Sequence, residues 1–403
     1  MKLEFPKNFF WGAATSAHQV EGNNHNDWTE WEHANAERLS KESGCKHPPE
    51  NYISGRACDH YNRFREDFDI AKSLGHNAHR FSIEWSRIEP EEGRWDEREI
   101  DHYRQVIAAL RERGIEPFVT LWHWTIPIWM RDKGGMESKE FSKYFTRFCE
   151  YVVKNIKGVN FWMTLNEPTS VIFNSYLRGL WPPQKKSAIS ALKVYWRLAE
   201  AHNMVYRAIH KVQKGAQVGF GNIMSYMEPA SDGILDKLAF RFANFFSNEY
   251  FLKLTNNNHD FLAVQYYFHF KVEFPAHKIS DEKRRSDMDW GIYPEGIYHL
   301  LKTLKKYNKP IYITENGVAD AKDVHREKFI KEHLQWVHKA ISEGVDVRGY
   351  FYWSLLDNFE WDSGFTPRFG LMEVDYKTME REIRQSALEY AKIARENAVE
   401  TGS

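Results

Sequence analysis

Short apolar segments alternate along the chain with longer stretches in which apolar residues recur every three to four positions. The apolar segments are rich in Phe, Tyr, Val and Ile, which is typical of buried strands. The intervening stretches fit amphipathic helices: residues 100–113 place Val106, Ile107 and Leu110 on one face and stop at Gly114, and residues 141–153 repeat the pattern. The expected strands are residues 9–14, 77–82, 116–121, 160–165, 218–222, 261–267, 310–315 and 348–354.

Alternation of strand and helix favours a parallel sheet with right-handed crossovers, and eight repeats close naturally into a barrel. We therefore predict an α/β fold, a (β/α)8 TIM barrel. No Pro-, Gly- or Ser-rich linker divides the chain, so residues 1–403 are expected to form a single domain with shortened loops between residues 222 and 310. Residues 39–52 are expected to be an inserted loop, and the Phe-rich residues 238–246 an outer helix packed on the barrel.

Composition narrows the possible functions. Hydrophobic residues make up 42% of the chain and charged residues 28%, which is sufficient for a large packed core. The formal net charge of -1 gives no basic face, so nucleic acid and anionic membranes are not expected partners. The three cysteines are widely spaced, the first residues lack the apolar core of a signal peptide, and no apolar run is long enough to span a bilayer. A cytoplasmic enzyme without metal or cofactor is the expectation, and its oligomeric state is left open.

Polar and aromatic residues follow seven of the eight predicted strands, where a barrel carries its active site. The fifth strand is the exception, because Asn222 at its end is not accompanied by such a group of residues. This combination suits a hydroxyl-rich ligand whose ring stacks on Trp, and two carboxylates in one mouth can divide acid and nucleophile roles. The residues at these strand ends are Gln19, Glu21, Arg80, Glu84, His123, Trp124, Asn166, Glu167, Tyr266, Tyr267, Glu315, Asn316, Trp353, Asp357, Glu360 and Trp361.

Five ordered blocks resemble the glycoside hydrolase family 1 enzymes, the β-glucosidase family. Residues 10–22 (FWGAATSAHQVEG) are similar to its N-terminal signature, and CDHY at 58–61 with RFSIEWSRI at 80–88 to the next block. TLNEP at 164–168 resembles the acid/base motif and ITENG at 313–317 the nucleophile motif. WSLLDNFEW at 353–361, followed by RFGL at 368–371, completes a resemblance that extends from about residue 7 to residue 390.

The resemblance implies a retaining β-glycosidase that cleaves terminal β-D-glucosides, and also β-galactosides or β-fucosides, through a covalent glycosyl-enzyme. It implies that Glu167 is the acid/base and Glu315 the nucleophile, with Arg80 and Tyr267 keeping Glu315 ionised. Asn166 would bind the sugar 2-hydroxyl, and Trp353 would form the floor under the ring. The other hydroxyl-binding residues implied are Gln19, His123, Glu360 and Trp361. Trp122, Trp124 and Trp129 are expected to be packing residues, while Phe369 could be either wall or core.

The chain departs from the family pattern at a few positions near these motifs. His18 stands where Tyr is usual, Thr125 where Asp is usual, and Ala263 and Gln265 where Gly and Asn are usual. Gln265 adds a methylene close to the predicted nucleophile.

Two alternatives are weighed against this interpretation. A 6-phospho-β-glycosidase would need cationic groups where Glu360 and Trp361 stand. A non-catalytic sugar-binding barrel would be expected to lack one of the two carboxylates, and both are present.

Overall fold

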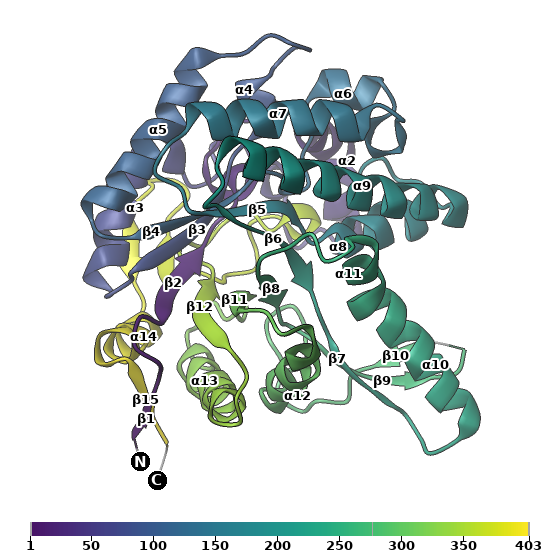
Figure 1. Ribbon diagram of the computed structural model, residues 1–403, viewed down its shortest axis with the longest axis vertical. Coiled ribbons are helices and arrows are strands. Elements are labelled where there is room, and N and C mark those ends of the chain that lie inside the picture. The colour runs from purple at the N-terminus through teal and green to yellow at the C-terminus, as the bar shows by residue number, and fades with distance from the viewer. Residues whose placement is uncertain (1, 276, 402–403) are drawn as a thin grey trace.

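The computed structural model describes residues 2–275 and 277–401, and eight parallel strands form a closed barrel at its centre (Figure 1). Each predicted apolar segment coincides with one of these strands, which confirms the (β/α)8 prediction. In order around the barrel the strands are β2 (Phe10–Ala14), β3 (Ala78–Ser82), β4 (Glu116–Thr120), β5 (Phe161–Asn166), β6 (Gln217–Ile223), β8 (Leu262–Gln265), β11 (Ile311–Asn316) and β12 (Val347–Trp353), which pairs with β2.

Helices surround the barrel, and most of the longer ones pack their apolar faces on it (Figure 1). The longer ones are α2 (Asp27–Glu42), α3 (His60–Ser73), α5 (Glu97–Glu112), α7 (Phe141–Asn155), α9 (Ala188–Val212), α10 (Ile234–Asn244), α12 (Glu295–Leu304), α13 (Arg326–Ser342) and α14 (Gln385–Glu396). Short helical segments lie in the loops: α1 (Ala17–Val20), η1 (Pro49–Tyr52), α4 (Trp85–Ile88), α6 (Ile128–Asp132), η2 (Gly135–Glu137), α8 (Pro168–Val171), η3 (Ile172–Leu177), η4 (Phe245–Glu249), α11 (Tyr250–Leu254), η5 (Lys305–Tyr307) and η6 (Trp361–Ser363).

The interior of the barrel is filled in layers, because alternate residues of each strand point inward. One end is closed by a cluster that includes Ala78, Phe118 and Phe351, packed against Phe161. The Phe118 and Phe161 rings stack with their centroids 4.1 Å apart. Two residues beyond Ala78 and Phe118, Arg80 and Thr120 replace the apolar side chains, so the packed core becomes polar toward the carboxyl ends of these strands.

Three small sheets lie outside the barrel. Strands β1 (Lys2–Glu4) and β15 (Ala398–Glu400) pair antiparallel and bring the two ends of the chain together (Figure 1). Strands β13 (Met372–Val374) and β14 (Arg381–Ile383) form a hairpin. Strands β7 (Tyr226–Pro229), β9 (His269–Glu273) and β10 (His277–Ile279) form a three-stranded sheet between β6 and α12.

Two local predictions need correction. The expected loop over residues 39–52 is partly helical: α2 continues to Glu42, because Trp28, Trp31 and Leu39 keep a buried helical face. The Phe-rich segment does form a helix, α10, which continues into η4, but α10 packs mainly on β7 and β9 of the outer sheet, through Ala239 and Ala243.

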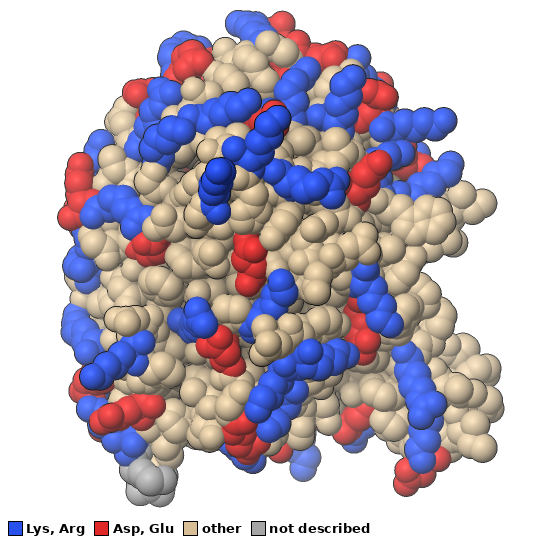
Figure 2. All heavy atoms as spheres, viewed as in Figure 1, with Lys and Arg blue, Asp and Glu red and all other residues tan. Residues whose placement is uncertain are grey.

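Charges of both signs are interspersed over the face of the molecule in Figure 2, in agreement with the net charge of -1. Within residues 2–275 and 277–401, none of the helices combines the length and apolar character that crossing a membrane requires.

Candidate active site

Two strand irregularities bring Glu315 and Asn166 into the barrel mouth. Regular alternation would turn Glu315 away from the interior, because Tyr312 of the same strand already points inward. The pairing of β11 with β8 shifts register between Ile313 and Glu315, and the pairing of β5 with β6 shifts between Met163 and Asn166. Such bulges re-aim side chains next to active sites. Both predicted catalytic strands therefore depart from regular geometry at the functional residue.

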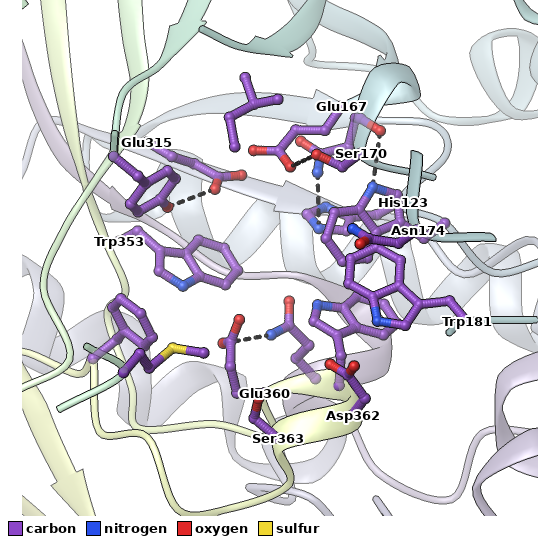
Figure 3. A pocket seen from close by; sticks show the side chains of 18 of the residues that line it. His123, Glu167, Ser170, Asn174, Trp181, Glu315, Trp353, Glu360, Asp362 and Ser363 are labelled. Carbon is purple, nitrogen blue, oxygen red and sulfur yellow. Dashed lines mark hydrogen bonds between the residues drawn. The ribbon is translucent and has the colours of Figure 1, made fainter. Parts of the chain in front are cut away.

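Glu167 occupies a strained position between β5 and α8. Its φ of 40° lies in the left-handed region, which non-glycine residues rarely adopt. Pro168 begins the helix at the position that suits a residue without an N–H. One turn later, Ser170 donates a hydrogen bond from Oγ to Glu167 Oε2 at 2.8 Å. The sharp turn from strand to helix thus points the carboxyl group into the pocket (Figure 3).

Glu315 is held by three donors. The Arg80 guanidinium bonds Oε1, Gln265 donates to the same oxygen at 2.8 Å, and the Tyr267 hydroxyl donates to Oε2 at 2.8 Å. Arg80 is fully buried and also bonds Thr120 and Asn166. A buried carboxylate with this many donors, one of them cationic, is stabilised in its ionised form.

The two glutamates have unequal proton affinities. Burial raises the pKa of Glu167 well above its ordinary value, and the neighbouring charge of Glu315 raises this pKa further. Burial also raises the pKa of Glu315, but Arg80 and Tyr267 oppose that effect. Glu167 is therefore the group that keeps its proton, and Glu315 is the group that loses its proton first.

His123 is neutral, and the position of its proton follows from Asn166. The Asn166 Oδ1 accepts bonds from Arg80 and Gln265, so its Nδ2 faces His123 Nε2, 3.1 Å away. Burial lowers the pKa of His123 well below its ordinary value. The Nε2 atom must then accept, which leaves the proton on Nδ1. Among the described residues this buried Nδ1 has no hydrogen-bond partner, and His123 lines the pocket.

The floor and the far end of the pocket are formed by β12 and the loop after it. Trp353 lies between Glu315 and Glu360 in Figure 3, and Trp361 stacks on His123 at 6.1 Å and 12°. Gln19 donates a hydrogen bond to Glu360 Oε2 at 3.2 Å. Burial, followed by the charge of Glu315, raises the pKa of Glu360 to about 8. Glu360 is therefore largely protonated at neutral pH and can donate as well as accept.

All ten residues predicted from the sequence meet at this one place. Nine line a pocket of about 190 Å³, and Arg80 lies beneath it against Glu315 and Asn166. The nine are Gln19, His123, Asn166, Glu167, Tyr267, Glu315, Trp353, Glu360 and Trp361.

The unusual residues have distinct environments. His18 donates from Nε2 to Glu32 at 2.6 Å and stacks on Trp361 with ring centroids 5.2 Å apart, so it supports the pocket-lining Trp361 from behind. Thr125 donates to Glu84 Oε2 at 2.9 Å. Ala263 packs in the apolar layer of the barrel. Of these four residues, only Gln265 hydrogen-bonds to Asn166 and Glu315.

Several lining residues were not predicted. Trp124, expected to be a packing residue, packs on Trp181 and Trp361; its indole also donates to the Asn166 carbonyl oxygen at 3.0 Å, and its side chain lines the pocket. Ser170 could have been found from its position one helical turn after Glu167. The remaining unpredicted lining residues lie in loops or at strand ends without a recognisable signal: Asn174, Trp181, Ile223, Phe268, Met288, Trp290, Asp362 and Ser363.

The site can divide acid and nucleophile roles between Glu167 and Glu315, which lie in one pocket with the Trp353 ring. A protonated and an ionised carboxyl group share one pocket, which is the requirement for cleaving a glycosidic bond. In the described part of the chain, His, Cys, Asp and Glu side chains form no cluster of three placed to hold a metal ion. The fold and the site together define a barrel enzyme of the glycosidase class.

Comparisons with known proteins agree with this class. The chain matches Glycosyl hydrolase family 1 over residues 1–261 and 254–399. It is 35% identical to β-glucosidase A of Thermotoga maritima, over 98% of this chain and 99% of that protein. A β-glycosidase structure from Pyrococcus horikoshii superposes with a TM-score of 0.92 at 39% identity, covering 100% of this chain and 97% of that one. A T. maritima β-glucosidase structure in complex with glucoimidazole gives 0.90 at 32% identity, with 99% and 100% coverage.

The chain therefore belongs to glycosyl hydrolase family 1, and it is a glycoside hydrolase.

Proposed function

We propose that this protein is a retaining β-glycosidase that hydrolyses terminal β-D-glucosides and also accepts β-galactosides and β-fucosides. The observation that carries the proposal is the unequal pair of carboxyl groups in one pocket: Glu167 is kept protonated by burial and by its neighbour's charge, while Glu315 is held by Arg80 and Tyr267. Relatives named as β-glucosidases support the glucoside specificity.

In the first step, a Glu315 carboxylate oxygen attacks the anomeric carbon and forms an ester. The bond from that carbon to the leaving oxygen breaks, and Glu167 gives its proton to the departing oxygen. Once Glu315 is esterified its negative charge is lost, and with that charge one cause of the raised Glu167 pKa. Glu167 then takes a proton from water, the water oxygen bonds the anomeric carbon, and the ester bond to Glu315 breaks.

The remaining polar residues would hold the sugar. Asn166 would bind the 2-hydroxyl through the Nδ2 hydrogen that His123 does not accept, and His123 lines the same pocket. Gln19, Glu360 and Trp361 would bind the hydroxyls at the far end, and Trp353 would support the ring. Hydrogen bonds to the sugar hydroxyls become stronger as the ring flattens toward the transition state. Such bonds lower the activation barrier as well as the dissociation constant of the substrate.

This pocket is less suited to binding a phosphorylated sugar than a neutral one. Among its lining residues in the described chain none is Lys or Arg, whereas three are Glu and one is Asp. A 6-phosphate near Glu360 would meet carboxyl groups and no cation. A neutral sugar is therefore the preferred substrate.

We further propose that residues 1–403 act as one catalytic unit in the cytoplasm. Strand ends and loops between Gln19 and Phe369 line one pocket, which supports a single unit. The cysteines Cys45, Cys58 and Cys149 are free thiols, as a reducing compartment favours.

The test is hydrolysis of 2,4-dinitrophenyl β-glucoside by the wild type, Glu315→Gln and Glu167→Gln, with and without azide. We expect an active wild type, an inactive Glu315→Gln, and azide rescue of Glu167→Gln alone, with β-glucosyl azide as product. If Glu167→Gln formed α-glucosyl azide instead, Glu167 would be the nucleophile and Glu315 the acid/base. If the wild type hydrolysed neither β-glucosides nor β-galactosides nor their 6-phosphates, the proposed activity would be wrong. A non-catalytic sugar-binding barrel would then be the preferred interpretation.

A further inference from the structure

Glu167 occupies the N-cap position of α8 but does not cap the helix. An ordinary N-cap carboxylate accepts hydrogen bonds from the backbone N–H groups two or three residues further on. Glu167 precedes α8 with a left-handed φ of 40°, and its carboxyl group makes no such bond. The carboxyl group therefore remains available to the pocket, and its orientation must be fixed by other contacts.

Ser170 provides these contacts. Its Oγ donates to Glu167 Oε2 at 2.8 Å, and its backbone N–H donates to the Glu167 carbonyl oxygen at 3.0 Å. On the other side, the Glu167 N–H donates to the Gly221 carbonyl oxygen on β6 at 2.8 Å. Ser170 thus bonds both the main chain and the side chain of Glu167, and a rotation of the carboxyl group would break the bond from Oγ.

The Ser170 hydroxyl is committed to this one interaction. Within residues 2–275 and 277–401, Glu167 Oε2 is the hydrogen-bond partner of Ser170 Oγ, and no second one is present. Ser170 is half-buried and lines the pocket beside Glu167. The hydroxyl therefore acts on the carboxyl group at the point where the leaving group of a substrate would be protonated.

The bond from Ser170 distinguishes the two carboxyl oxygens of Glu167. Glu167 keeps its proton in the resting enzyme, because burial and the charge of Glu315 raise its pKa. In a carboxylic acid, the oxygen that accepts a hydroxyl hydrogen is the carbonyl oxygen, so the proton lies on Oε1. In Figure 3 this second oxygen points away from Ser170, toward Glu315. The proton therefore lies on the oxygen that faces the space between the two carboxyl groups.

Ser170 differs from the other groups around Glu167 because it is neutral. The titratable side chains around the pocket come from different parts of the barrel: Arg80 on β3, His123 after β4, Tyr267 after β8, Glu315 on β11, and Glu360 and Asp362 after β12. Burial has the largest effect on the Glu167 pKa and raises it, Glu315 raises it further, and the Ser170 hydrogen bond lowers it. Removing the Ser170 hydroxyl therefore changes this pKa without changing any charge in the pocket.

We propose that Ser170 is a positioning residue for the acid/base: its hydroxyl holds the Glu167 carboxyl group in place and keeps the transferable proton on Oε1. This inference rests on the proposed function. When the glycosidic bond breaks, its electron pair moves to the leaving oxygen, which takes the proton from Oε1. The Ser170 hydrogen stays on Oγ and continues to donate to Oε2, where it stabilises the carboxylate that forms. Ser170 makes the proton easier to release and is not itself part of the transfer.

The experiment compares kcat/KM for phenyl and 2,4-dinitrophenyl β-D-glucoside in the wild type, Ser170→Ala and Ser170→Thr. The first step determines kcat/KM, and the phenyl glucoside depends on the Glu167 proton, because dinitrophenolate leaves without one. A positioned acid typically contributes about 10²- to 10⁴-fold, so we expect Ser170→Ala to lose about tenfold with the phenyl glucoside and less than about twofold with the dinitrophenyl glucoside. Ser170→Thr keeps the hydroxyl and should keep the wild-type ratio of the two substrates. An unchanged ratio in Ser170→Ala would overturn the inference.

The pH profile is a readout that a packing role would not change. The basic limb of kcat/KM for the phenyl glucoside reports the loss of the Glu167 proton from the free enzyme. The lost hydrogen bond stabilised the carboxylate, so in Ser170→Ala this limb should move to higher pH by about one unit. A limb that stays in place would mean that the Ser170 hydroxyl does not act on Glu167.

Thr169→Val is the matched control. Thr169 precedes Ser170 in α8, its buried Oγ1 has no hydrogen-bond partner among the described residues, and its side chain does not line the pocket. The variant removes a hydroxyl from the same helix and should leave both the substrate ratio and the basic limb at their wild-type values. Equal changes in Thr169→Val and Ser170→Ala would show a general disturbance of α8, and the inference would be wrong.

The two substrates also separate the possible failures. Cleavage of the dinitrophenyl glucoside by Ser170→Ala shows that the variant has a folded site. If its activity on both substrates falls equally, Ser170 supports the turn and not the proton transfer, and the inference is wrong while the proposed function stands. If the wild type cleaves neither glucoside, the proposed function and the inference fail together.

Discussion

The side-chain amide of Gln265 occupies the space beside Gly221 that a β-carbon would otherwise fill. A Cβ built on Gly221 would lie 2.8 Å from Gln265 Nε2 and 3.1 Å from Asn166 Oδ1. The missing side chain of one residue thus gives room for the additional methylene of the other. Both Nε2 hydrogens of Gln265 are used, one on Asn166 at 2.7 Å and one on Glu315 at 2.8 Å. Gln265 therefore links Asn166 to Glu315.

Gly221→Ala should disturb this link. The new methyl group would force Gln265 to move, and Glu315 and Asn166 would lose a shared donor, so we expect kcat to fall by about one to two orders of magnitude with a smaller change in KM. Shortening the amide by one methylene should relieve the conflict. In a Gln265→Asn background, Gly221→Ala should therefore lower kcat much less than it does in the wild type.

The double-mutant cycle measures this coupling directly. We expect a coupling free energy of at least about 1 kcal/mol between positions 221 and 265, as is typical of residues in contact. A control cycle between positions 265 and 215 should give no coupling, because a β-carbon on Gly215 would meet nothing within 4 Å. Additive effects at 221 and 265 would show that Gln265 has no special role in the site.

Arg80→Gln should change the pH dependence as well as the rate. The guanidinium opposes the burial that raises the Glu315 pKa, so its loss should raise this pKa further. Because the nucleophile must be ionised, the acid limb of the kcat/KM profile is expected to move to higher pH, and kcat/KM at neutral pH to fall by at least about a hundredfold.

Stability should fall in the same variant. Leaving one partner of a buried ion pair alone typically costs about 3–5 kcal/mol, and Arg80 is fully buried. Urea unfolding measures this loss. Arg348→Gln is the control, because Arg348 forms an exposed pair with Asp346 and should alter neither the profile nor the midpoint. An acid limb that stays in place in Arg80→Gln would contradict the role assigned to this pair.

The fold could be predicted because each strand carries its own signal. Eight apolar, β-rich segments separated by helical periodicity leave few alternatives to a closed barrel. The site residues could be predicted because strand ends in a barrel converge, whatever the loops do. The sequence periodicity could also have predicted that the helix extends into residues 39–52, because Leu39 continues the buried face that begins at Trp28.

The remaining features depend on tertiary contacts that no short segment encodes. The fit of Gln265 beside Gly221 joins residues on different strands, and the hydrogen bond from Trp124 to the Asn166 carbonyl joins residues that are 42 positions apart. Whether α10 packs on the barrel or on the outer sheet depends on the positions of β7 and β9. Loop residues such as Trp181, Met288 and Asp362 reach the pocket from positions where the sequence shows only irregular structure.

Glu360→Gln should make stability less dependent on pH. Burial and the charge of Glu315 raise the pKa of Glu360 to about 8 in the folded protein, above the ordinary value of 4.5. The folded state then binds more protons than the unfolded state between these values, so this residue's contribution to stability is lost as pH rises through that interval. Glutamine carries no charge at any pH, and we expect the free energy of unfolding of the variant, relative to the wild type, to increase by about 1 kcal/mol or more between pH 5 and pH 8.5. Urea titrations at the two pH values give this difference, with the exposed Glu382→Gln on β14 as the control that should show none. A difference between Glu360→Gln and the wild type that is the same at both pH values would mean that Glu360 is already ionised in the folded protein, and that the sugar end of the pocket carries a negative charge.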